Sequence, residues 1–162
     1  MPQQYLVLDT TAFYAGVPYT NTTENLVTTP DVISEVSNER TRTLIALSKI
    51  NVLQGTLANL KTVKDAARRT GDNSMTVADL SVLALCLSIR EEGNEAILLS
   101  DDFAVENVAS TLGIKARPLM TNGIKTASEW VFFCPACGKK YQKQRADCLV
   151  CGTRLEKRLK RN

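Results

Sequence analysis

Two Cys-x-x-Cys-Gly motifs near the C-terminal end constrain the fold of this chain more tightly than any other feature. The segment FFCPACGKKYQKQRADCLVCGTR holds both motifs, ten residues apart, and their thiols belong to Cys134, Cys137, Cys148 and Cys151. Paired cysteines at this spacing are typical of tetrahedral zinc sites, and the glycine after each pair permits the tight turn of a zinc knuckle. We therefore predict a small zinc ribbon that binds a structural Zn²⁺ through these cysteines.

Disulfides are the alternative use of these thiols, and they require an oxidising compartment. The N-terminus lacks the basic stretch and uninterrupted apolar run of a secretory signal. No apolar run approaches the roughly 20 residues that cross a bilayer. We therefore expect a cytoplasmic protein with reduced thiols and no membrane partner. The remaining cysteine, Cys86, lies at helical spacing among apolar residues, and we expect it to pack in the core.

Apolar runs alternate with helical patterns over the residues before the cysteine motifs. The runs at 5–8, 50–54, 96–100 and 114–119 predict strands, and the Thr- and Asn-rich segment 20–28 predicts a loop. Helices are predicted after the N-cap Thr29, over 56–71, from Thr76 to Gly93, and over 103–113. Strands alternating with helices indicate an α/β fold, with a parallel sheet flanked by helices on both faces.

The chain therefore divides into a domain at 1–120, a linker at 121–130, a zinc ribbon at 131–155 and a basic tail at 156–162. Side-chain charge follows this division, because residues 131–162 carry +7 while the rest carries −4, within a net charge of +3. An acidic body with a basic C-terminal segment is typical of a protein that binds a polyanion. The alternative is that the basic residues only keep the chain soluble.

Five acids lie where an apolar core has no obvious use for them. Asp9 ends the first predicted strand, and Asp101 and Asp102 follow the strand at 96–100. The carboxyl ends of parallel strands meet at one edge of a sheet, where ligands bind. Asp79 and Glu35 lie among apolar residues of two predicted helices, on what we take to be buried stripes. Each acid alone has an ordinary explanation as a helix cap or surface residue, but together they predict a common site.

The composition narrows the chemistry of such a site. The chain has no histidine, which excludes histidine bases and histidine metal ligands. Clustered carboxylates repel one another unless a cation neutralises them, and sites built from oxygen ligands suit Mg²⁺ or Mn²⁺. Such an ion activates a water and stabilises the leaving oxygen in phosphodiester cleavage. We therefore expect Asp9 to form one wall of a divalent-metal site.

The segments LDTTAF, PDVISEV, TVADLSVLALCL and LLSDDFAVENVA, in that order, resemble the acidic motifs of PIN-domain ribonucleases. The resemblance covers about residues 4–119 and implies a PIN-like fold. It also implies that the acids bind Mg²⁺ or Mn²⁺ and hydrolyse single-stranded RNA. The matching catalytic and metal-binding positions are Asp9, Glu35, Asp79 and Asp102, with Asp101 as a second candidate beside Asp102.

A PIN domain followed by a zinc ribbon resembles the Nin-one-binding (NOB) endonuclease family of archaea and eukaryotes, and the compact length is similar to its archaeal members. This resemblance implies an endoribonuclease that matures the 3′ end of precursor small-subunit ribosomal RNA. The implied partners are that RNA, the pre-ribosomal small subunit and its assembly factors. The ribbon of the family contributes to RNA binding, which here would use Lys139, Lys140, Lys143, Arg145 and Arg154.

Three other functions fit parts of the pattern. A toxin-like PIN ribonuclease shares the acids, but toxins of that kind do not usually carry a zinc ribbon. A non-catalytic RNA-binding assembly factor would not need a complete set of acids. A phosphoacceptor receiver domain needs a lysine at the end of its last strand, whereas Lys115 lies near the start of IKARPL.

Overall fold

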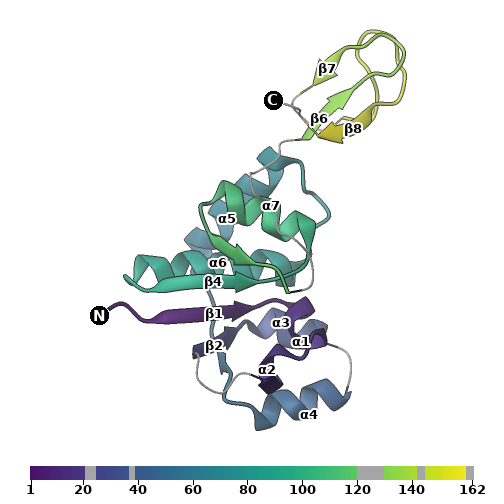
Figure 1. Ribbon diagram of the computed structural model, residues 1–162. Helices are drawn as coiled ribbons and strands as arrows, with labels where there is room; N and C mark the ends of the chain where they lie inside the picture. Colours follow the sequence, from purple (N-terminus) through teal and green to yellow (C-terminus); the bar gives the residue numbers. More distant parts are fainter. Residues whose placement is uncertain (21–24, 37–38, 120–129, 142–144, 160–162) are drawn as a thin grey trace.

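The computed structural model describes residues 1–20, 25–36, 39–119, 130–141 and 145–159. Within these ranges the chain forms a five-stranded sheet flanked by helices and a separate three-stranded sheet (Figure 1). Neighbouring strands of the larger sheet are parallel throughout. The α/β class predicted from the sequence is therefore confirmed.

Strand order in the larger sheet is β3-β2-β1-β4-β5. In chain order these strands are Gln4–Leu8 (β1), Asn25–Thr28 (β2), Asn51–Val52 (β3), Glu95–Leu99 (β4) and Lys115–Arg117 (β5). The central pair, β1 and β4, runs in register with Tyr5 opposite Ala96. Both strands carry consecutive buried residues because helices cover both faces of the sheet. Their carboxyl ends consequently place Asp9 and Ser100 side by side.

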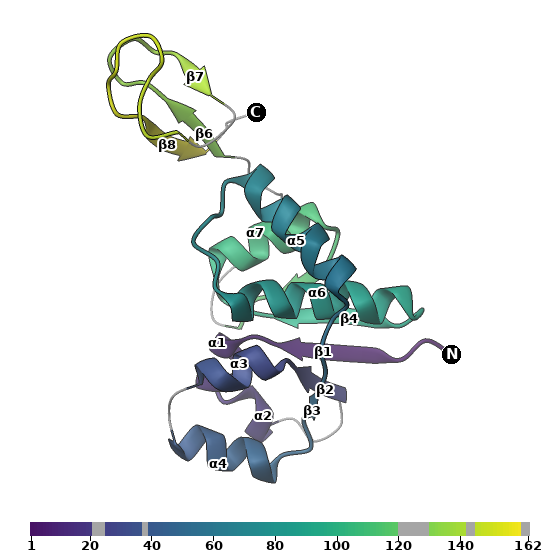
Figure 2. The same ribbon diagram turned by 180° about the vertical axis from the view of Figure 1, so that it is seen from behind.

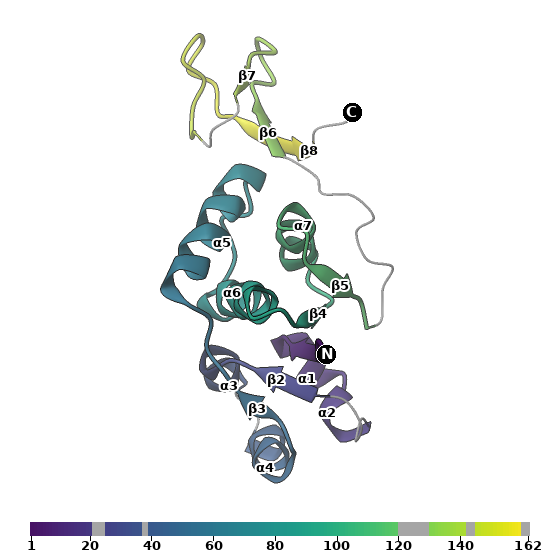
Figure 3. The same ribbon diagram turned by 90° about the vertical axis from the view of Figure 1, so that its left-hand side faces the viewer.

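Seven helices surround this sheet among the described residues. They are Thr10–Tyr14 (α1), Val17–Thr20 (α2), Pro30–Glu35 (α3), Glu39–Leu47 (α4), Leu57–Thr70 (α5), Val77–Glu91 (α6) and Phe103–Thr111 (α7). Seen along the strands, α3, α6 and α7 lie on one side of the sheet and α2 on the other (Figure 3). The core between them is built largely from fully buried side chains such as Leu6, Leu8, Val82, Leu83 and Leu98.

The predicted helix ends are confirmed where their capping residues could be recognised. Thr29 caps α3, with Pro30 as its first residue, and Thr76 forms a reciprocal capping box with Asp79 at the start of α6. Gly71 ends α5 in the left-handed conformation, with φ of 77°. Local side-chain chemistry determines these ends, so the sequence alone predicts them.

The loop predicted over 20–28 is wrong at 25–28, because Asn25–Thr28 is the strand β2. Leu26, Val27 and Thr28 are buried, and β2 pairs with β1 from Asn25 to Val27. A strand this short gives no recognisable apolar run, and its stability comes from the neighbouring strand. The predicted strands at 50–54 and 114–119 shorten to β3 and β5, which are the edge strands of the sheet.

The second sheet consists of Trp130–Phe133 (β6), Lys140–Tyr141 (β7) and Glu156–Leu159 (β8), in the order β7-β6-β8. We call this part, residues 130–141 and 145–159, the C-terminal ribbon. Of the predicted linker, residues 121–129 lie outside the described residues and Trp130 begins β6. The predicted basic tail also differs, because residues 156–159 pair with β6, while 160–162 lie outside the described residues.

The C-terminal ribbon contacts the larger domain at the end of α5. The ammonium nitrogen of Lys157 donates a hydrogen bond to the carbonyl oxygen of Gly71 at 2.8 Å. Figure 2 shows the ribbon beyond this end of α5, on the side of the molecule away from α4. A cation near the C-terminus of a helix is favourable because the helix dipole is negative there. Across the described segments, no helix combines the length and the apolar character needed to cross a membrane.

Gly55 connects β3 to α5 at a place where the chain lies directly against the backbone of α6. A β-carbon added at Gly55 would lie 2.5 Å from the carbonyl carbon of Ala84 and 2.7 Å from the backbone nitrogen of Leu85. These atoms belong to a buried helix and cannot move as a flexible side chain can. The glycine therefore sets how closely this crossing packs on α6.

We expect Gly55→Ala to lower the free energy of unfolding by about 1–3 kcal/mol, because the added methyl group overpacks a buried backbone contact. The neighbouring exposed Gln54 offers a control, and Gln54→Ala should change stability by no more than about 0.5 kcal/mol. Urea unfolding followed by circular dichroism measures both. Equal stability of the two variants would contradict the close approach.

Candidate active site and metal centre

Asp9 lies directly after β1 and is only 1% exposed. One carboxylate oxygen, Oδ1, accepts a hydrogen bond from the backbone N–H of Thr10 at 2.7 Å. The other, Oδ2, accepts one from the Ser100 hydroxyl at 2.7 Å. Burial raises the pKa of Asp9 to about 6, although these hydrogen bonds lower it, and nearby carboxylates raise it further. The position therefore holds a carboxylate whose negative charge is incompletely compensated by the protein.

The end of β4 supplies the next acid through a chain of hydrogen bonds. The Ser100 hydroxyl, which donates to Asp9, also accepts from the backbone N–H of Asp102 at 3.1 Å. Asp102 caps α7, because its Oδ1 accepts from the N–H groups of Ala104 and Val105 at 2.8 and 3.2 Å. Its other oxygen accepts no hydrogen bond from the described residues, so one oxygen remains available to a ligand.

Asp79 is half-buried in the first turn of α6. Its Oδ2 accepts from the backbone N–H of Thr76 at 2.7 Å, which leaves the second carboxylate oxygen for other contacts. Burial raises the pKa of Asp79, and the charges of Asp102 and Glu35 raise it further. The same carboxylate therefore closes a helix end and lies within the electrostatic influence of two other acids.

Glu35 is the last residue of α3, and its Oε2 accepts a hydrogen bond from the Thr10 hydroxyl. A bond of 2.7 Å between the hydroxyls of Thr29 and Ser81 joins the start of α3 to α6. The prediction that Glu35 lies on a buried stripe is wrong, because its side chain is exposed. The helix has only six residues, and it buries Val32 rather than its last turn.

Asp101, the alternative to Asp102, has a different set of contacts. Its Oδ1 accepts from the backbone N–H of Leu119 at 2.7 Å, and its own N–H donates to the Thr11 hydroxyl at 3.1 Å. The carboxylate thus holds the segment that follows β5 against the end of β4. One of its oxygens is committed to the backbone rather than directed to the other acids.

The structure brings Asp9, Glu35, Asp79 and Asp102 together at the carboxyl edge of the sheet. Asp79 and Asp102 both act on the pKa of Asp9, and Glu35 acts on that of Asp79, so the four carboxylates form one electrostatic cluster. They are spaced more widely than a closed ligand cage, since no three of them have ligand oxygens all within 4.8 Å of one another. This arrangement fits Mg²⁺ or Mn²⁺, which bind few carboxylates and keep several waters.

The four cysteines of the C-terminal ribbon form the tightest group of metal-ligating side chains in the described residues, with all sulfur atoms within 4.8 Å of one another. The Sγ atoms of Cys134 and Cys151 lie 3.3 Å apart, and those of Cys137 and Cys148 lie 3.5 Å apart. A disulfide bond is about 2.05 Å long, so the thiols are not paired. Four convergent thiols are a ligand set that Zn²⁺ prefers.

Each Cys-x-x-Cys pair sits in a knuckle turn. Gly138 and Gly152 both have φ of 73°, and their N–H groups donate at 2.9 Å to the carbonyl oxygens of Cys134 and Cys148. The Tyr141 hydroxyl lies 3.1 Å from the Cys148 sulfur, and this contact lowers the pKa of Cys148 to about 6. A thiol that ionises readily is ready to bind a metal. Cys86, by contrast, is fully buried in the core, as predicted, and its burial raises its pKa.

The predicted RNA-binding residues of the ribbon are exposed where they are described. This applies to Lys139, Lys140, Arg145 and Arg154. Lys143 lies outside the described residues.

Comparison with known proteins adds an independent line of evidence. The family described as PIN domain of ribonuclease matches residues 6–89. The endoribonuclease Nob1 of Pyrococcus abyssi is 36% identical over 155 residues, which is 91% of this chain and 89% of the relative. That of Archaeoglobus fulgidus is 34% identical over 130 residues, which is 80% of this chain and 77% of the relative. The chain belongs to the Nob1 endoribonuclease family.

Membership of the Nob1 family confirms the endoribonuclease predicted from the sequence. The ribonuclease VapC3 of Aeropyrum pernix is also similar, with 32% identity over 126 residues, but the match covers 75% of this chain. The Nob1 of Pyrococcus abyssi matches more of the chain, as expected for a relative that shares more than the PIN domain.

Sequence reasoning missed the hydroxyl side chains that hold the acids of this Nob1-family chain in place. Ser100 binds Asp9, Thr10 binds Glu35, and the Thr29–Ser81 pair joins two of the contributing helices. Thr10 and Ser100 each stand next to an acid in the sequence, since Thr10 follows Asp9 and Ser100 precedes Asp101. A serine or threonine flanking an acid at a strand end was the signal that could have found them.

Asp9 provides a test of the cluster through its effect on stability. Its folded pKa of about 6 lies above the ordinary 3.8, so the folded protein binds the proton more tightly than the unfolded chain. Protonation of Asp9 therefore stabilises the folded state. This contribution to the free energy of unfolding is fully present below pH 3.8 and is lost as the pH rises through about 6. In metal-free buffer at neutral pH, Asp9→Asn should therefore raise the free energy of unfolding by about 1–3 kcal/mol.

Thermal unfolding with and without Mn²⁺ measures this effect. Mn²⁺ should stabilise the unmodified chain and leave Asp9→Asn unchanged, because the variant lacks a charged ligand. Glu92→Gln, at the exposed far end of α6, is the control and should respond to Mn²⁺ as the unmodified chain does. A destabilised Asp9→Asn in metal-free buffer, or one that Mn²⁺ stabilises fully, would contradict the site.

The cysteine group provides a second test. We expect the purified chain to hold one Zn²⁺, and its chelation to unfold the C-terminal ribbon while the parallel sheet remains folded. The ribbon has little core of its own, since its described buried residues are Phe132, Cys134 and Cys148.

Metal analysis and amide NMR spectra measure both effects. Cys148→Ser should lose the zinc, whereas Cys86→Ala should keep it. Retention of zinc by Cys148→Ser would refute the ligand set, and so would ribbon resonances that stay dispersed after chelation.

Proposed function

We propose that this chain cleaves precursor small-subunit ribosomal RNA at its 3′ end during ribosome maturation, using Mg²⁺ or Mn²⁺. The observation that carries the proposal is the convergence of Asp9, Glu35, Asp79 and Asp102 into one electrostatic cluster in a chain of the Nob1 family. The RNA substrate is inferred from that family, and the pre-ribosomal small subunit with its assembly factors is the proposed setting.

The four acids have distinct tasks in this proposal. Asp9 supplies the most desolvated carboxylate, and the Ser100 hydroxyl and the Thr10 N–H fix both of its oxygens in position. Asp79 and Asp102 each use one oxygen as a helix cap, which leaves the other for a ligand. Glu35 is held by Thr10 at the exposed side, where the substrate phosphate enters.

A bound divalent ion would supply the activation of a water molecule and the neutralisation of the leaving oxygen. The protein residues contribute the orientation of that ion and the exclusion of competing ligands. We assign Asp102 to the metal site, and we assign Asp101 a structural task, because an Asp101 oxygen holds the backbone at Leu119.

The C-terminal ribbon is proposed to bind the RNA backbone with Lys139, Lys140, Lys143, Arg145 and Arg154, around a structural Zn²⁺. The larger domain over residues 1–120 would then perform cleavage, and the ribbon would supply much of the affinity. This division follows from charge, since residues 131–162 carry +7 and the remainder carries −4. The unpaired thiols fit the reducing cytoplasm, where we place the protein.

Cleavage of an RNA that spans the mature 3′ end of the small-subunit precursor tests the proposal. With Mn²⁺ the chain should cut once, at that end. Asp9→Asn and Asp79→Asn should lower the cleavage rate by at least about a hundredfold, because each removes a charged metal ligand. Glu92→Gln should keep the full rate.

Two results would overturn parts of the proposal separately. Cleavage of unrelated single-stranded RNA at many sites would retain a PIN ribonuclease but reject the ribosomal substrate. Failure of the metal-loaded chain to cut any RNA would reject catalysis by the acid cluster.

The cleavage rate of Asp101→Asn should stay within about tenfold of the rate of the unmodified chain, because we expect the substitution to affect mainly the position of the residues after β5.

A further inference from the structure

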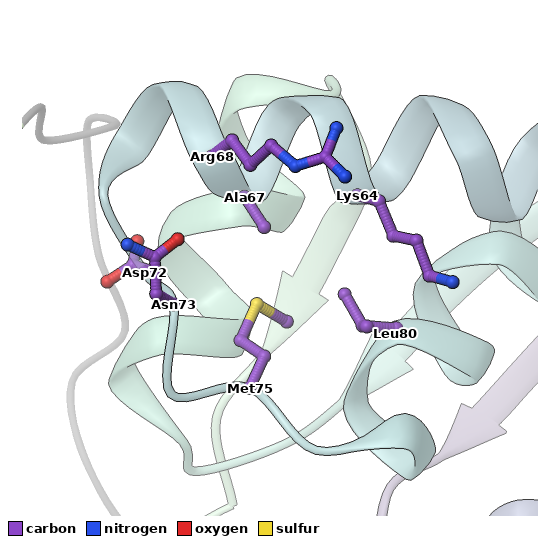
Figure 4. A pocket seen from close by; sticks show the side chains of 7 residues that line it. All are labelled: Lys64, Ala67, Arg68, Asp72, Asn73, Met75 and Leu80. Atoms are coloured by element: carbon purple, nitrogen blue, oxygen red, sulfur yellow. The ribbon is translucent and has the colours of Figure 1, made fainter. Parts of the chain in front are cut away.

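A pocket of about 300 Å³ lies beside the loop that joins α5 to α6. Its volume is at the lower end of the range for small-molecule sites, about 300–1,000 Å³. Figure 4 shows the side chains that line it, which are Lys64, Ala67, Arg68, Asp72, Asn73, Met75 and Leu80. None of these residues belongs to the acid cluster or to the ribbon.

The lining has two chemically distinct parts. Lys64 and Arg68 extend from α5 on one side, and Met75 and Leu80 lie opposite them, with Ala67 between (Figure 4). The apolar part suits a flat ring, and the polarisable thioether of methionine makes favourable contacts with aromatic rings. The cationic part suits a phosphate. A base and its phosphate together match this combination.

Both cations can engage a ligand. Lys64 is exposed and has no ion-pair or hydrogen-bond partner among the described residues. Arg68 pairs with Asp65 at 2.8 Å, but the two side chains are 71% and 49% exposed. An ion pair with this much exposure contributes little to stability. Arg68 can therefore exchange Asp65 for a phosphate at small cost.

Asp72, the acid among the lining residues, does not cancel the positive charge that Lys64 and Arg68 bring to the pocket. Asp72 is 4% exposed, and its Oδ2 accepts a hydrogen bond from the Asn107 amide in α7 at 2.8 Å. Its carboxylate is thus directed to the interior, and Figure 4 shows it at the end of the pocket remote from the Lys64 ammonium. The accessible charge of the pocket is positive.

The pocket also lies between the two sites already described. Met75 and Leu80 flank the capping box of Thr76 and Asp79, and adjacent α-carbons are only about 3.8 Å apart. At the other end, Asp72 follows Gly71, whose carbonyl oxygen binds Lys157 of the ribbon. The lining therefore adjoins both sites along the chain, and this gives an RNA strand held by the ribbon a route over the pocket towards the acid cluster.

We infer that this pocket is a nucleotide subsite for single-stranded RNA. It takes one base of the substrate against Met75 and Leu80, while Lys64 and Arg68 bind the adjoining phosphate. The inference rests on the proposed ribonuclease function and extends it, because it assigns part of substrate recognition to the catalytic domain. The subsite would fix the register of the RNA relative to the acids.

Kinetics of cleavage in Mn²⁺ test the subsite with the full chain. The double variant Lys64→Ala/Arg68→Ala should raise KM roughly tenfold, with kcat changed by no more than about twofold, because these side chains are remote from the reacting bond. The salt dependence of RNA binding should weaken by about 0.7 in slope for each phosphate that the variant no longer binds. The matched control is Lys61→Ala/Arg69→Ala, which removes the same charge from exposed positions of α5 outside the pocket.

A binding measurement locates the base. In an Asp9→Asn background, which keeps the RNA intact, 2-aminopurine is placed at successive positions of a short single-stranded RNA that spans the cleavage site. One position should change its fluorescence on binding, and Met75→Ala should abolish that change. Thermal unfolding of each variant verifies that it remains folded.

The outcomes separate this inference from the proposed function. If the unmodified chain cleaves and the pocket and control variants have the same KM and salt slope, the subsite is refuted while the function stands. If the chain does not cleave, the proposed function fails, and the fluorescence scan still decides the subsite. A fluorescence change that Met75→Ala leaves intact places the base elsewhere.

Discussion

The hydrogen bond from Ser100 to Asp9 is the interaction on which the arrangement of the site depends. It joins the ends of the two central strands, and the same hydroxyl accepts from Asp102. The carboxylate of Asp9 is thereby kept in a position with almost no access to solvent. Its pKa is raised mainly by this burial, so the folded chain stores an unfavourable charge. A cation bound there would relieve that charge, and its affinity would then depend on the packing of β1 against β4.

The sequence predicts those parts of the structure that local chemistry determines. Thr29 with Pro30, Thr76 with Asp79, and Gly71 each specify a helix end within a few residues. The strand β2 was missed because its burial comes from β1, whose contribution no local pattern reveals. The same reasoning explains Glu35, which lies among apolar residues in the sequence yet is exposed, because the short helix α3 leaves its last turn outside the core.

The two halves of the molecule reach stability by different physical means. The parallel sheet buries a continuous set of aliphatic side chains between its helices, whereas the buried residues described in the C-terminal ribbon are one phenylalanine and two cysteines. A small antiparallel sheet with so few described buried residues needs another source of folding energy, and a metal ion bound by the four convergent thiols would provide one. The cysteine spacing could be recognised in the sequence because the same spacing brings the four thiols together in the structure.

Asp79 and Asp102 each close the start of a helix as well as belonging to the acid cluster, whereas Glu35 caps no helix. We therefore expect selection to act differently on these residues. A relative that had lost catalysis would still need Asp79 and Asp102 for the stability of α6 and α7. Selection on Glu35 would relax with the loss of activity. Among relatives with this fold, we therefore expect the residue at position 35 to mark an active nuclease better than the two capping aspartates do.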